Sequence, residues 1–372
     1  MIKVGITGQN GFIGQHLYNT LGLFNEEIER VSFQRDFFSD NLKLTEFVSQ
    51  CDVVVHLAAL NRHDDPDIIY QTNITLVRNL VDVLQTSGKK PHVIFSSSSQ
   101  EELDNLYGKS KKEGRQLLAD WAHREGAKFT GMVIPNVFGP FGNPYYNSFI
   151  ATFCHQLTHG ESPKIEVDGQ VKLIYIDELV KIFLREIRTE SGKGLLNVPH
   201  TAEYKVSEIL NMLESYKLQY LEGGVIPALN TPFELHLFNT FRAYIRIENH
   251  YPVKYLQHID SRGDFVEIIR LNIGGQVSFS TTLPGIIRGN HYHTRKIERF
   301  VVIKGLALIQ LRKIGTPEVH EIYLDGDKPS FVDIPIWHTH NIKNIGDENL
   351  YTIFWTNEFY DQKDHDTFFE IV

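Results

Sequence analysis

The stretch that decides the fold of the second half of the chain is Gly285-Ile-Ile-Arg-Gly-Asn-His291-Tyr-His293-Thr-Arg-Lys-Ile-Glu298. In a β-strand, residues i and i+2 project from the same face, so His291 and His293 can point at one spot. Glu298 follows closely, and a second histidine block, Pro335-Ile-Trp-His338-Thr-His340, lies downstream. Imidazole nitrogens and a carboxylate oxygen together form a mixed metal site. A lone His-x-His pair is common on exposed strands, but this spacing with a second histidine block favours a metal.

Short segments of alternating apolar and polar residues surround this stretch, with glycine and proline turns between them. They predict antiparallel strands of a β-sandwich or barrel, at residues 265–271, 276–282, 299–303, 307–311, 319–324 and 351–355. With the Gly-x5-His-x-His-x4-Glu-x6-Gly spacing, the region resembles the cupin β-barrels. The resemblance implies four metal ligands, His291, His293, Glu298 and His340. Trp337 stands where the second cupin motif has a glycine, and His338 is an alternative ligand or an acid–base group.

The first residues of the chain predict a different fold. Ile2–Thr7 has the composition of a buried strand, and Gly8-Gln-Asn-Gly11-Phe-Ile-Gly14 follows it before a helical pattern. A glycine turn between a strand and a helix lets the backbone approach a pyrophosphate, and N–H groups at the helix start favour the anion. Such a turn also occurs in α/β proteins that bind no dinucleotide, so the glycines alone leave both interpretations open.

Buried strand patterns then alternate with helical ones. Strands are predicted at residues 31–33, 52–57, 92–97 and 129–134, and helices at 69–84 and 107–123. The alternation predicts an α/β Rossmann-like doubly wound parallel sheet. Residues 141–244 are less informative and end in a predicted helix at 233–244, while Asn136 and Lys172 are either substrate contacts or ordinary loop residues. The predicted domains are residues 1–244 and 245–372.

Tyr107 and Lys111 stand four residues apart at the start of a predicted helix, which places them on one face. An ammonium group beside a phenol stabilises the phenolate and lowers the tyrosine pKa from about 10. With a serine hydroxyl from the preceding strand end, the pair suits proton transfer that accompanies hydride transfer at a carbon bearing oxygen. An exposed helix pair has the same spacing, but the run Ser96-Ser-Ser-Ser99 favours the catalytic interpretation.

Residues 1 to about 240 resemble the extended short-chain dehydrogenase/reductases that act on sugar nucleotides. The motifs in family order are the glycine turn, His56-Leu-Ala-Ala59, Asn73, Ser98, Tyr107/Lys111, Pro135-Asn-Val-Phe-Gly-Pro140 and Tyr175-Ile-Asp-Glu178. The resemblance implies Ser98, Tyr107 and Lys111 as catalytic residues, with Ser97 and Ser99 as the alternatives to Ser98. It implies a cofactor site built from Gly8, Gly11, Phe12, Ile13, Gly14, Arg35, Leu57, Ala58, Ala59, Tyr107 and Lys111. The interval from Ser98 to Tyr107 is shorter than in most of the family, which puts the usual substrate-loop geometry in doubt.

The end of the second predicted strand distinguishes the two nicotinamide cofactors. Its sequence is Phe33-Gln-Arg35-Asp36, and Arg35 lies about 20 residues beyond the last glycine, where a ribose contact is expected. The planar guanidinium suits a 2′-phosphate, which favours NADPH. Asp36 is the alternative, because an acidic residue at this place binds the ribose 2′-hydroxyl of NADH.

Composition argues against several classes of function. The 372 residues carry a net charge of −9 without a basic run, so no nucleic-acid partner is expected. The sequence has no signal-peptide pattern and no run of about 18 apolar residues, so no membrane association is expected. Two cysteines, Cys51 and Cys154, fit a reducing compartment, and the cytoplasm is the predicted location.

Both halves together resemble the bifunctional bacterial enzymes of capsule and O-antigen lipopolysaccharide synthesis, which make UDP-activated 2-acetamido-2,6-dideoxy-L-hexoses. Their signature is Pro284-Gly-Ile-Ile-Arg-Gly-Asn-His-Tyr-His293. The resemblance implies that the barrel epimerises C3 of a UDP-linked 4-keto-6-deoxy amino sugar and that the first domain reduces C4. It also implies a divalent metal, predicted to be zinc, and a homodimer through the barrel. The alternative is a C4 reductase whose barrel only binds or dimerises, and the epimerase base is open among His338, Tyr292 and Glu321.

Overall fold

The computed structural model describes residues 1–146, 148–189, 191–261 and 263–372, which form two compact units. Unit 1 comprises Met1–Thr152 and Val167–Val206, and unit 2 comprises Phe153–Glu166 and Ser207–Val372. The boundary predicted between residues 244 and 245 lies between the helices α8 (Pro232–Arg242) and α9 (Ile247–His250), shortly before the antiparallel strands. Contacts divide the chain differently, because the helical residues 207–244 belong with the strands that follow them.

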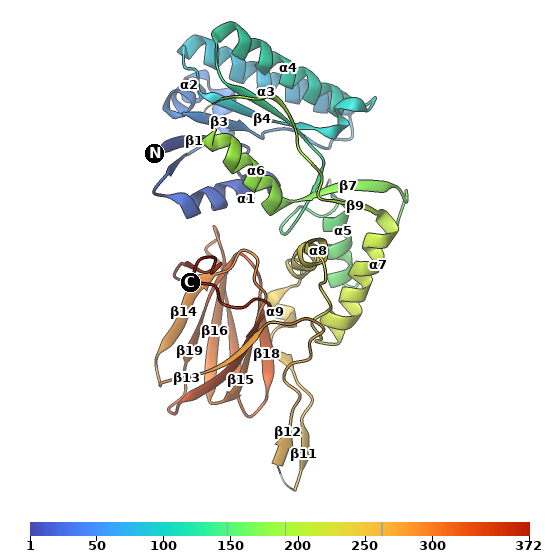
Figure 1. Cartoon of the computed structure of the whole chain (residues 1–372), viewed down its shortest axis with the longest axis vertical. Coiled ribbons are helices and arrows are strands. Elements are labelled where there is room, and N and C mark those ends of the chain that lie inside the picture. The colour runs from blue at the N-terminus through green and yellow to red at the C-terminus, as the bar shows by residue number, and fades with distance from the viewer. Residues whose placement is uncertain (147, 190, 262) are drawn as a thin grey trace. The chain divides into compact units, whose positions relative to one another are not determined.

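A six-stranded parallel sheet with the order β2-β1-β3-β4-β5-β8 lies at the centre of unit 1 (Figure 1). Its strands are β1 (Ile2–Thr7), β2 (Ile28–Val31), β3 (Val53–His56), β4 (His92–Ser98), β5 (Phe129–Ile134) and β8 (Gly194–Asn197). The strand predicted at 31–33 is wrong in its bounds. Phe33 lies beyond β2 and packs edge-on against Phe37, Phe38 and Phe47.

Helices cover both faces of this sheet (Figure 1). On one face lie α2 (Asn41–Gln50), α3 (Pro66–Ser87) and α4 (Leu106–Glu125), and on the other lie α1 (Phe12–Leu21) and α6 (Ile176–Arg188). Short turns of helix follow α1, β2 and β4, namely η1 (Gly22–Phe24), η2 (Arg35–Ser39) and η3 (Ser99–Glu102). The predicted doubly wound α/β fold is confirmed. Its strand order reverses between β1 and β3, and ligands of such sheets bind at that edge.

The two long helices of unit 1 end where their sequence specifies. Asp65 caps the start of α3 with a side-chain hydrogen bond from Asp67 N, and Pro66 occupies the first turn. Asn105 caps α4 in the same way, with its side chain accepting from Gly108 N. Gly88 and Gly126 close these helices in the left-handed conformation that glycine adopts without strain. The cap at Asn105 fixes where α4 begins, and it therefore fixes the position of Tyr107 in the first turn.

A small mixed sheet and several helices lie in the sequence between β5 of the parallel sheet and the antiparallel strands of unit 2. The sheet has the order β6-β7-β9 and consists of β6 (Asn136–Phe138), β7 (Gln170–Tyr175) and β9 (Ala202–Lys205). The helices are α5 (Phe149–Thr158), α7 (Val206–Tyr216), η4 (Lys217–Glu222), α8 (Pro232–Arg242) and α9 (Ile247–His250). No helix within the described residues is both long enough and apolar enough to cross a membrane.

Two five-stranded antiparallel sheets form the core of unit 2 (Figure 1). The first has the order β10-β18-β15-β20-β13, with β10 (Val253–Lys254), β13 (Gln276–Thr282), β15 (Glu298–Lys304), β18 (Ser330–Ile334) and β20 (Leu350–Thr356). The second has the order β17-β16-β19-β14-β21, with β14 (Ile287–Tyr292), β16 (Leu306–Lys313), β17 (Val319–Asp325), β19 (His338–Asn344) and β21 (Phe368–Phe369). Buried aliphatic side chains from both sheets pack together. The predicted all-β cupin barrel is confirmed.

One predicted strand of this half is wrong. Residues 265–271 contain only the end of a two-stranded hairpin, β11 (His258–Asp260) and β12 (Gly263–Phe265). Beyond it, the backbone N–H of Ile226 donates to Arg270 O and that of Asn272 donates to Ile226 O. The alternating pattern therefore belongs to a segment that pairs with the loop before α8 rather than with the barrel sheets.

A buried polar cluster joins the helical part of unit 2 to the barrel. Arg299 and Asp333 form a paired guanidinium–carboxylate contact at 2.7 and 2.8 Å, and both side chains are essentially inaccessible. Tyr220 donates to the same carboxylate at 2.8 Å, and Arg242 donates to Ile334 O at 2.6 Å. Breaking such a buried pair typically costs about 3–5 kcal/mol. These contacts explain why residues 207–244 belong with the strands.

Candidate functional site

The glycine turn after β1 is closed by backbone contacts that only glycine allows. Gly8 has a φ of +80°, and a Cβ there would lie 2.8 Å from Ala58 N, at the end of β3. A Cβ on Gly14 would lie 2.2 Å from Gly8 O, whereas one on Gly11 would meet the same oxygen at 3.3 Å. The turn therefore lies at the reversal point of the sheet, against residues 57–59, with Phe12 and Ile13 in the first turn of α1. This arrangement suits a pyrophosphate.

The loop after β3 is tied to the helix that carries Tyr107. Asn73 accepts a hydrogen bond from Leu60 N at 2.7 Å and donates to Leu60 O at 3.0 Å. It also donates to the hydroxyl of Ser110 at 3.1 Å. Because Asn73 is buried, these bonds fix the loop of Leu57, Ala58 and Ala59 relative to α4.

Arg35 is the first residue of η2, and its side chain is exposed. The neighbouring carboxylate of Asp36 is paired with Lys43 Nζ at 3.0 Å. The basic residue therefore faces solvent beyond β2, while the charge of the acidic alternative is compensated by a lysine of α2. This contact favours Arg35 as the residue that meets a ribose phosphate.

Tyr107 and Lys111 lie on one face of α4, as their spacing predicts. Lys111 is buried, donates to Ser96 O at 2.7 Å, and has its Nζ 5.9 Å from the centre of the Tyr107 ring. Burial lowers the pKa of Lys111 to about 8, although Glu101 opposes the shift. The pKa of Tyr107 is raised to about 12 by burial, with a contribution from Tyr146. The lowering of the tyrosine pKa expected from the lysine is not found in this structure, where burial is the main cause of the shift.

The four serines at the end of β4 differ in their surroundings. Ser96 is buried and donates to His56 O at 3.3 Å, and the hydroxyl of Ser97 donates to Glu101. Ser99 is exposed. Ser98 is the last residue of β4, and its hydroxyl accepts a hydrogen bond from Gln100 N at 3.2 Å. Its place at the carboxyl end of a central strand fits the predicted role, which stays a prediction.

The short interval between Ser98 and Tyr107 is closed by a close backbone approach. A Cβ on Gly108 would lie 2.0 Å from Gln100 O, so only glycine permits α4 to begin this near η3. The same carbonyl accepts a hydrogen bond from Leu103 N at 2.9 Å. The loop is thereby compact without the longer insertion that the family commonly has.

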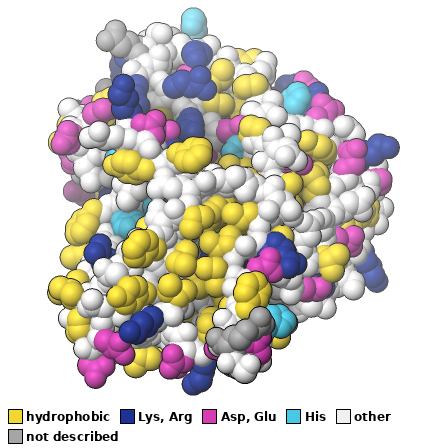
Figure 2. Space-filling view, turned by 60° about the horizontal axis from the view of Figure 1, so that its bottom comes forward, with side chains coloured by type: hydrophobic (Ala, Val, Ile, Leu, Met, Phe, Trp, Pro, Cys, Tyr) yellow, Lys and Arg dark blue, Asp and Glu magenta, His cyan; other side chains and the backbone are white. Residues whose placement is uncertain are grey.

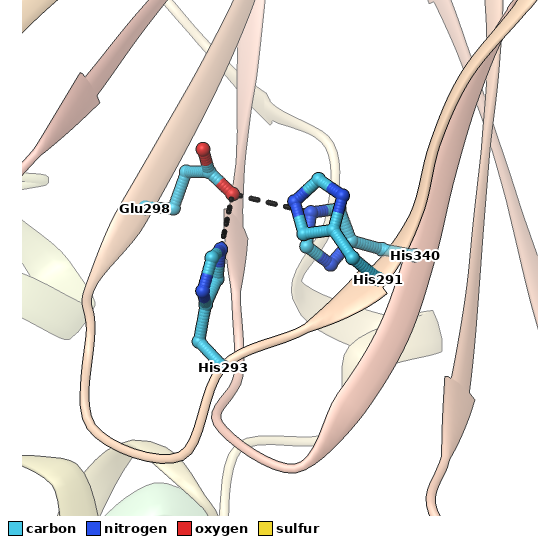
Figure 3. A group of neighbouring side chains, drawn as sticks. All are labelled: His291, His293, Glu298 and His340. Atoms are coloured by element: carbon cyan, nitrogen blue, oxygen red, sulfur yellow. Dashed lines mark hydrogen bonds and ion pairs between the residues drawn. The ribbon is translucent and has the colours of Figure 1, made fainter. Parts of the chain in front are cut away.

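Three histidines and one glutamate converge inside unit 2 (Figure 3). His291, His293, Glu298 and His340 each offer one ligand atom, and these atoms lie within 4.8 Å of one another. Glu298 Oε2 lies 3.3 Å from His293 Nε2 and 3.1 Å from His340 Nε2. The cluster is buried apart from His291, which is partly exposed. All four predicted ligands are thus brought together.

The chemistry of this cluster fits a divalent metal. Among the described residues, His340 Nε2 is buried without a hydrogen-bond partner, although it lies at ion-pair distance from Glu298. Burial and the neighbouring imidazoles lower the pKa of His291 to about 4, which leaves its lone pair available. Burial opposes ionisation of Glu298, but His293 and His340 hold the pKa of its carboxyl well below the usual range. Imidazole nitrogens together with a carboxylate oxygen are the ligand set of Zn²⁺ and related ions.

A β-bulge aims His291 at the cluster. Between β14 and β19, Gly289 pairs with Asn341 and His291 pairs with His340, so Asn290 is an extra residue. Gly289 and Asn290 have φ values of +100° and +60°. Because an extra residue reverses which face the next side chain meets, the bulge places His291 beside His340. His293 lies beyond the end of β14, so the regular strand expected across both histidines is wrong, although their convergence is confirmed.

Trp337, which stands at the glycine position of the second cupin motif, has a left-handed backbone conformation. Its φ is +58°, a region in which bulky residues are rare, and its side chain is buried. Its backbone N–H donates to His293 O at 2.7 Å, and its indole ring stacks on the ring of Tyr292 with centroids 5.7 Å apart. The departure from the cupin motif therefore places a buried aromatic ring next to the loop that begins at His293.

The candidates for the epimerase base occupy different places. Gln310 pairs with both Asn341 and Glu321, so Glu321 lies on the face opposite to His340. His338 is buried, and its Nδ1 lies 3.0 Å from Ile336 O. Tyr292 is also buried.

Asn136 and Lys172, the two candidate substrate contacts, are partners within the small sheet of unit 1. Asn136 donates to the backbone carbonyl of Lys172 at 3.3 Å. The contact gives Asn136 a structural partner, and a role for either residue at the substrate stays a prediction.

Two family models match the chain. The model described as the NAD dependent epimerase/dehydratase family matches residues 4–198, and the Polysaccharide biosynthesis C-terminal domain matches residues 258–368. The chain belongs to the NAD dependent epimerase/dehydratase family. The predicted extended short-chain dehydrogenase/reductase half is thereby confirmed as a member of the epimerase/dehydratase family, and the second half matches a polysaccharide-biosynthesis domain.

Two relatives match this epimerase/dehydratase family member over nearly its whole length, and a third matches part of it. The UDP-2-acetamido-2,6-beta-L-arabino-hexul-4-ose reductase of Pseudomonas aeruginosa is 32% identical over 371 residues, which are 99% of this chain and 98% of the relative. The crystal structure of the capsular polysaccharide assembling protein CapF of Staphylococcus aureus has a TM-score of 0.63 at 33% identity, with 100% of both chains covered. The spore coat polysaccharide biosynthesis protein SpsL of Bacillus subtilis is 30% identical over 125 residues, which are 30% of this chain and 82% of that protein. The predicted resemblance to enzymes of capsule and O-antigen synthesis is confirmed.

Proposed function

We propose that this chain is a bifunctional sugar-nucleotide enzyme. The barrel epimerises C3 of a UDP-2-acetamido-2,6-dideoxy-L-hexos-4-ulose, and unit 1 reduces the C4 ketone with NADPH. The product is a UDP-2-acetamido-2,6-dideoxy-L-hexose of the L-talose type, for capsule or O-antigen synthesis. The observation that carries the proposal is the presence of two separate side-chain sets, around Tyr107 and around His291, in a chain that matches a hexul-4-ose reductase from end to end.

Unit 1 supplies the residues for reduction at C4. When bound, NADPH supplies the hydride. Tyr107 donates the proton that the C4 oxygen needs as the carbonyl becomes a hydroxyl, and Ser98 holds that oxygen by a hydrogen bond. Lys111 stabilises the tyrosinate that remains, because its ammonium group is held beside the ring by Ser96 O. Arg35 selects the 2′-phosphate of NADPH.

The barrel supplies the residues for epimerisation. A ketone at C4 acidifies the proton on C3, so a base can remove this proton and an acid can return one to the other face. A divalent ion held by His291, His293, Glu298 and His340, which we propose to be zinc, supplies Lewis-acid stabilisation of the negative charge that develops on the sugar. His338 and Tyr292 stay as candidates for the base, since both are buried in the barrel.

Deuterium exchange tests the epimerase half directly. The protein is incubated with UDP-4-keto-6-deoxy-N-acetylhexosamine in deuterated water without NADPH, and NMR locates the label on the sugar. We expect deuterium at C3 with the wild type and none with His291→Ala/His293→Ala. The matched control is His320→Ala, which removes an imidazole of β17 outside the cluster. Absence of exchange in the wild type would sink the epimerase.

The same experiment decides the alternative, in which the barrel only binds or dimerises. Adding NADPH to the double variant separates the two functions, because reduction at C4 does not need the cluster. If the double variant reduces the ketone to the same stereoisomer as the wild type, the chain is a C4 reductase alone. If it gives the C3 epimer of the wild-type product, both halves are enzymes.

The barrel also presents a surface that fits a second copy of this chain. β13 is an edge strand of its sheet, and Val277 and Phe279 on it are more than half exposed. Figure 2 shows hydrophobic side chains gathered on the face that it draws. An exposed apolar edge strand is a template for pairing with another chain, so we propose a homodimer through the barrel. Light scattering after gel filtration tests it, with dimers expected for the wild type and monomers for Phe279→Glu.

We place this reaction in the cytoplasm. Cys51 and Cys154 are both free and buried, which fits a reducing compartment. Fractionation of cells that express the chain tests the location, with the protein expected in the supernatant after membranes are removed.

A further inference from the structure

The loop between β14 and β15 begins with His293 and leads directly to Glu298, the first residue of β15, and its other partners come from far along the sequence. Asp366, 73 residues after His293, lies against this loop and is 4% exposed. The neighbouring side chains of the same segment also reach the loop: Arg295 pairs with Glu358 at 3.0 Å and with Asp364 at 2.9 Å. The segment of residues 358–370 therefore packs against the loop of the candidate metal site.

The carboxylate of Asp366 accepts hydrogen bonds from four donors of the loop. Oδ1 accepts from Thr294 N at 3.0 Å and from the Thr294 hydroxyl at 2.6 Å. Oδ2 accepts from Arg295 N and Lys296 N, each at 3.0 Å. Three consecutive N–H groups on one carboxylate fix the backbone between His293 and Glu298, because bonds to an ionised acceptor are short and strong.

The backbone of Asp366 contacts a cluster residue itself. Its carbonyl oxygen lies 2.5 Å from His293 Nδ1, so this nitrogen carries the proton and donates it to the carbonyl. When His293 is neutral, this tautomer leaves the lone pair of its Nε2 on the side of Glu298 and His340 (Figure 3). Metal-binding histidines commonly donate their second N–H in this way, and the partner sets the orientation of the ring.

The segment is anchored on the strands of the cluster as well. In β21, Phe369 pairs with His291 and Phe368 pairs with Tyr292. Beyond β21, Glu370 forms an ion pair with Arg312 at 2.7 Å. Asp366 itself has a φ of +40°, which a residue other than glycine adopts only where its surroundings impose it. The contacts on both sides of Asp366 supply that constraint.

We infer that Asp366 is a positioning residue of the metal site, which sets metal affinity by holding His293 and the loop to Glu298 in place. The inference rests on the proposed metal site. Removing the carboxylate is expected to weaken metal binding about 10- to 100-fold, the usual effect of losing a group that orients a ligand. The reductase residues of unit 1 are not involved, so NADPH-dependent reduction stays at the wild-type rate.

Metal binding to the full chain tests this inference without an activity assay. Metal-free wild type and Asp366→Asn are titrated with Zn²⁺ against a chromophoric chelator, and with Co²⁺, whose visible absorption reports the ligand geometry. We expect a raised Kd and an altered Co²⁺ spectrum for Asp366→Asn. The matched control is Asp361→Asn, which removes the same charge from the same segment, where the carboxylate bonds to Lys363 N of its own turn. Its Kd and spectrum are expected to equal those of the wild type.

Thr294→Val guards against a variant that does not fold. It removes only the 2.6 Å hydroxyl contact and leaves the three N–H bonds, so the expected rise in Kd is smaller but in the same direction. If Asp366→Asn is folded and binds both metals as the wild type does, the inference is wrong. If Asp366→Asn does not fold, an unchanged Kd and spectrum for Thr294→Val overturn it. A wild type that binds neither metal contradicts the proposed metal site itself, which is a distinguishable result.

Discussion

The reductase site and the metal site differ in how far apart in the sequence their parts lie. Tyr107 and Lys111 share one turn of α4, and Gly8 and Gly14 share one glycine turn. The cluster of His291 and His340 depends on the pairing of β14 with β19 and on a bulge between them. Local geometry thus builds the first site, whereas strand register and a distant segment build the second. The two sites should accordingly respond to substitution independently.

The largest expected effect is that of Tyr107→Phe. Loss of the proton donor should slow NADPH-dependent reduction by about 100- to 10,000-fold, because a positioned general acid contributes this much. Exchange at C3 in the barrel should be unchanged, which separates the two sites. Single-turnover oxidation of NADPH, followed by absorbance, measures the first effect, and NMR measures the second. Tyr70→Phe, which removes a phenol bonded to Glu113, is the control. A loss below about tenfold contradicts the role of Tyr107.

Arg35→Ala should have the next largest effect. The KM for NADPH is expected to rise about 10- to 100-fold, since a hydrogen-bonded charge is worth about 1.5–3 kcal/mol, and the KM for NADH should stay the same. Initial rates with both cofactors measure the difference. Lys43→Ala removes the partner of Asp36 and serves as the control for charge changes near η2. Equal rises with both cofactors, or a wild type that prefers NADH, would falsify the assignment of Arg35.

Sequence patterns predicted the parts that local geometry determines. The bounds of β1, β5 and β13 match the predicted strands, and the i, i+4 spacing placed Tyr107 beside Lys111. The residues of the candidate metal cluster were also predictable, because three of them lie within eight residues and the fourth follows a recognisable motif.

Long-range contacts could not be predicted in the same way. Asp366 has no sequence signal, since its four hydrogen bonds depend on where a segment 70 residues away passes. The bulge at Asn290 had a weak signal, because Gly-Asn favours positive φ, but its pairing partner is set by β19. The raised pKa of Tyr107 was missed because burial depends on the whole fold and not on the neighbouring lysine. Reactive groups are therefore easier to predict from the sequence than the surroundings that set their pKa values and orientations.

Gly108→Ala tests how strictly local geometry holds the reductase site. The new methyl group would lie 2.0 Å from Gln100 O, so the backbone must shift, at a cost of about 1–3 kcal/mol in the free energy of unfolding. The shift moves Ser98 relative to Tyr107, and the kcat for reduction should fall as well. Gly169→Ala is the matched control, because a methyl group there meets nothing within 4 Å. Urea denaturation and steady-state rates measure both effects. Wild-type stability in Gly108→Ala would show that the close approach is not needed.

The smallest expected effect is a pH dependence that arises from the buried ammonium of Lys111. Its pKa is lowered from 10.5 to about 8 by burial, so between these values the unfolded chain binds a proton that the folded chain has lost. Stability rises with pH wherever the unfolded state holds more protons, by up to about 1.4 kcal/mol per pH unit for one group. As the pH rises from about 8 to about 9, the free energy of unfolding of the wild type should therefore increase by about 1 kcal/mol relative to that of Lys111→Met.

Urea denaturation at several pH values between these limits measures that gain. Lys112→Met is the control, since the neighbouring side chain is exposed and its ammonium group meets water in both states. Parallel curves for the wild type and Lys111→Met would mean that the ammonium group keeps its proton in the folded protein. The charge beside Tyr107 would then be present throughout this pH range, and the burial of Lys111 would not limit its role in stabilising the tyrosinate.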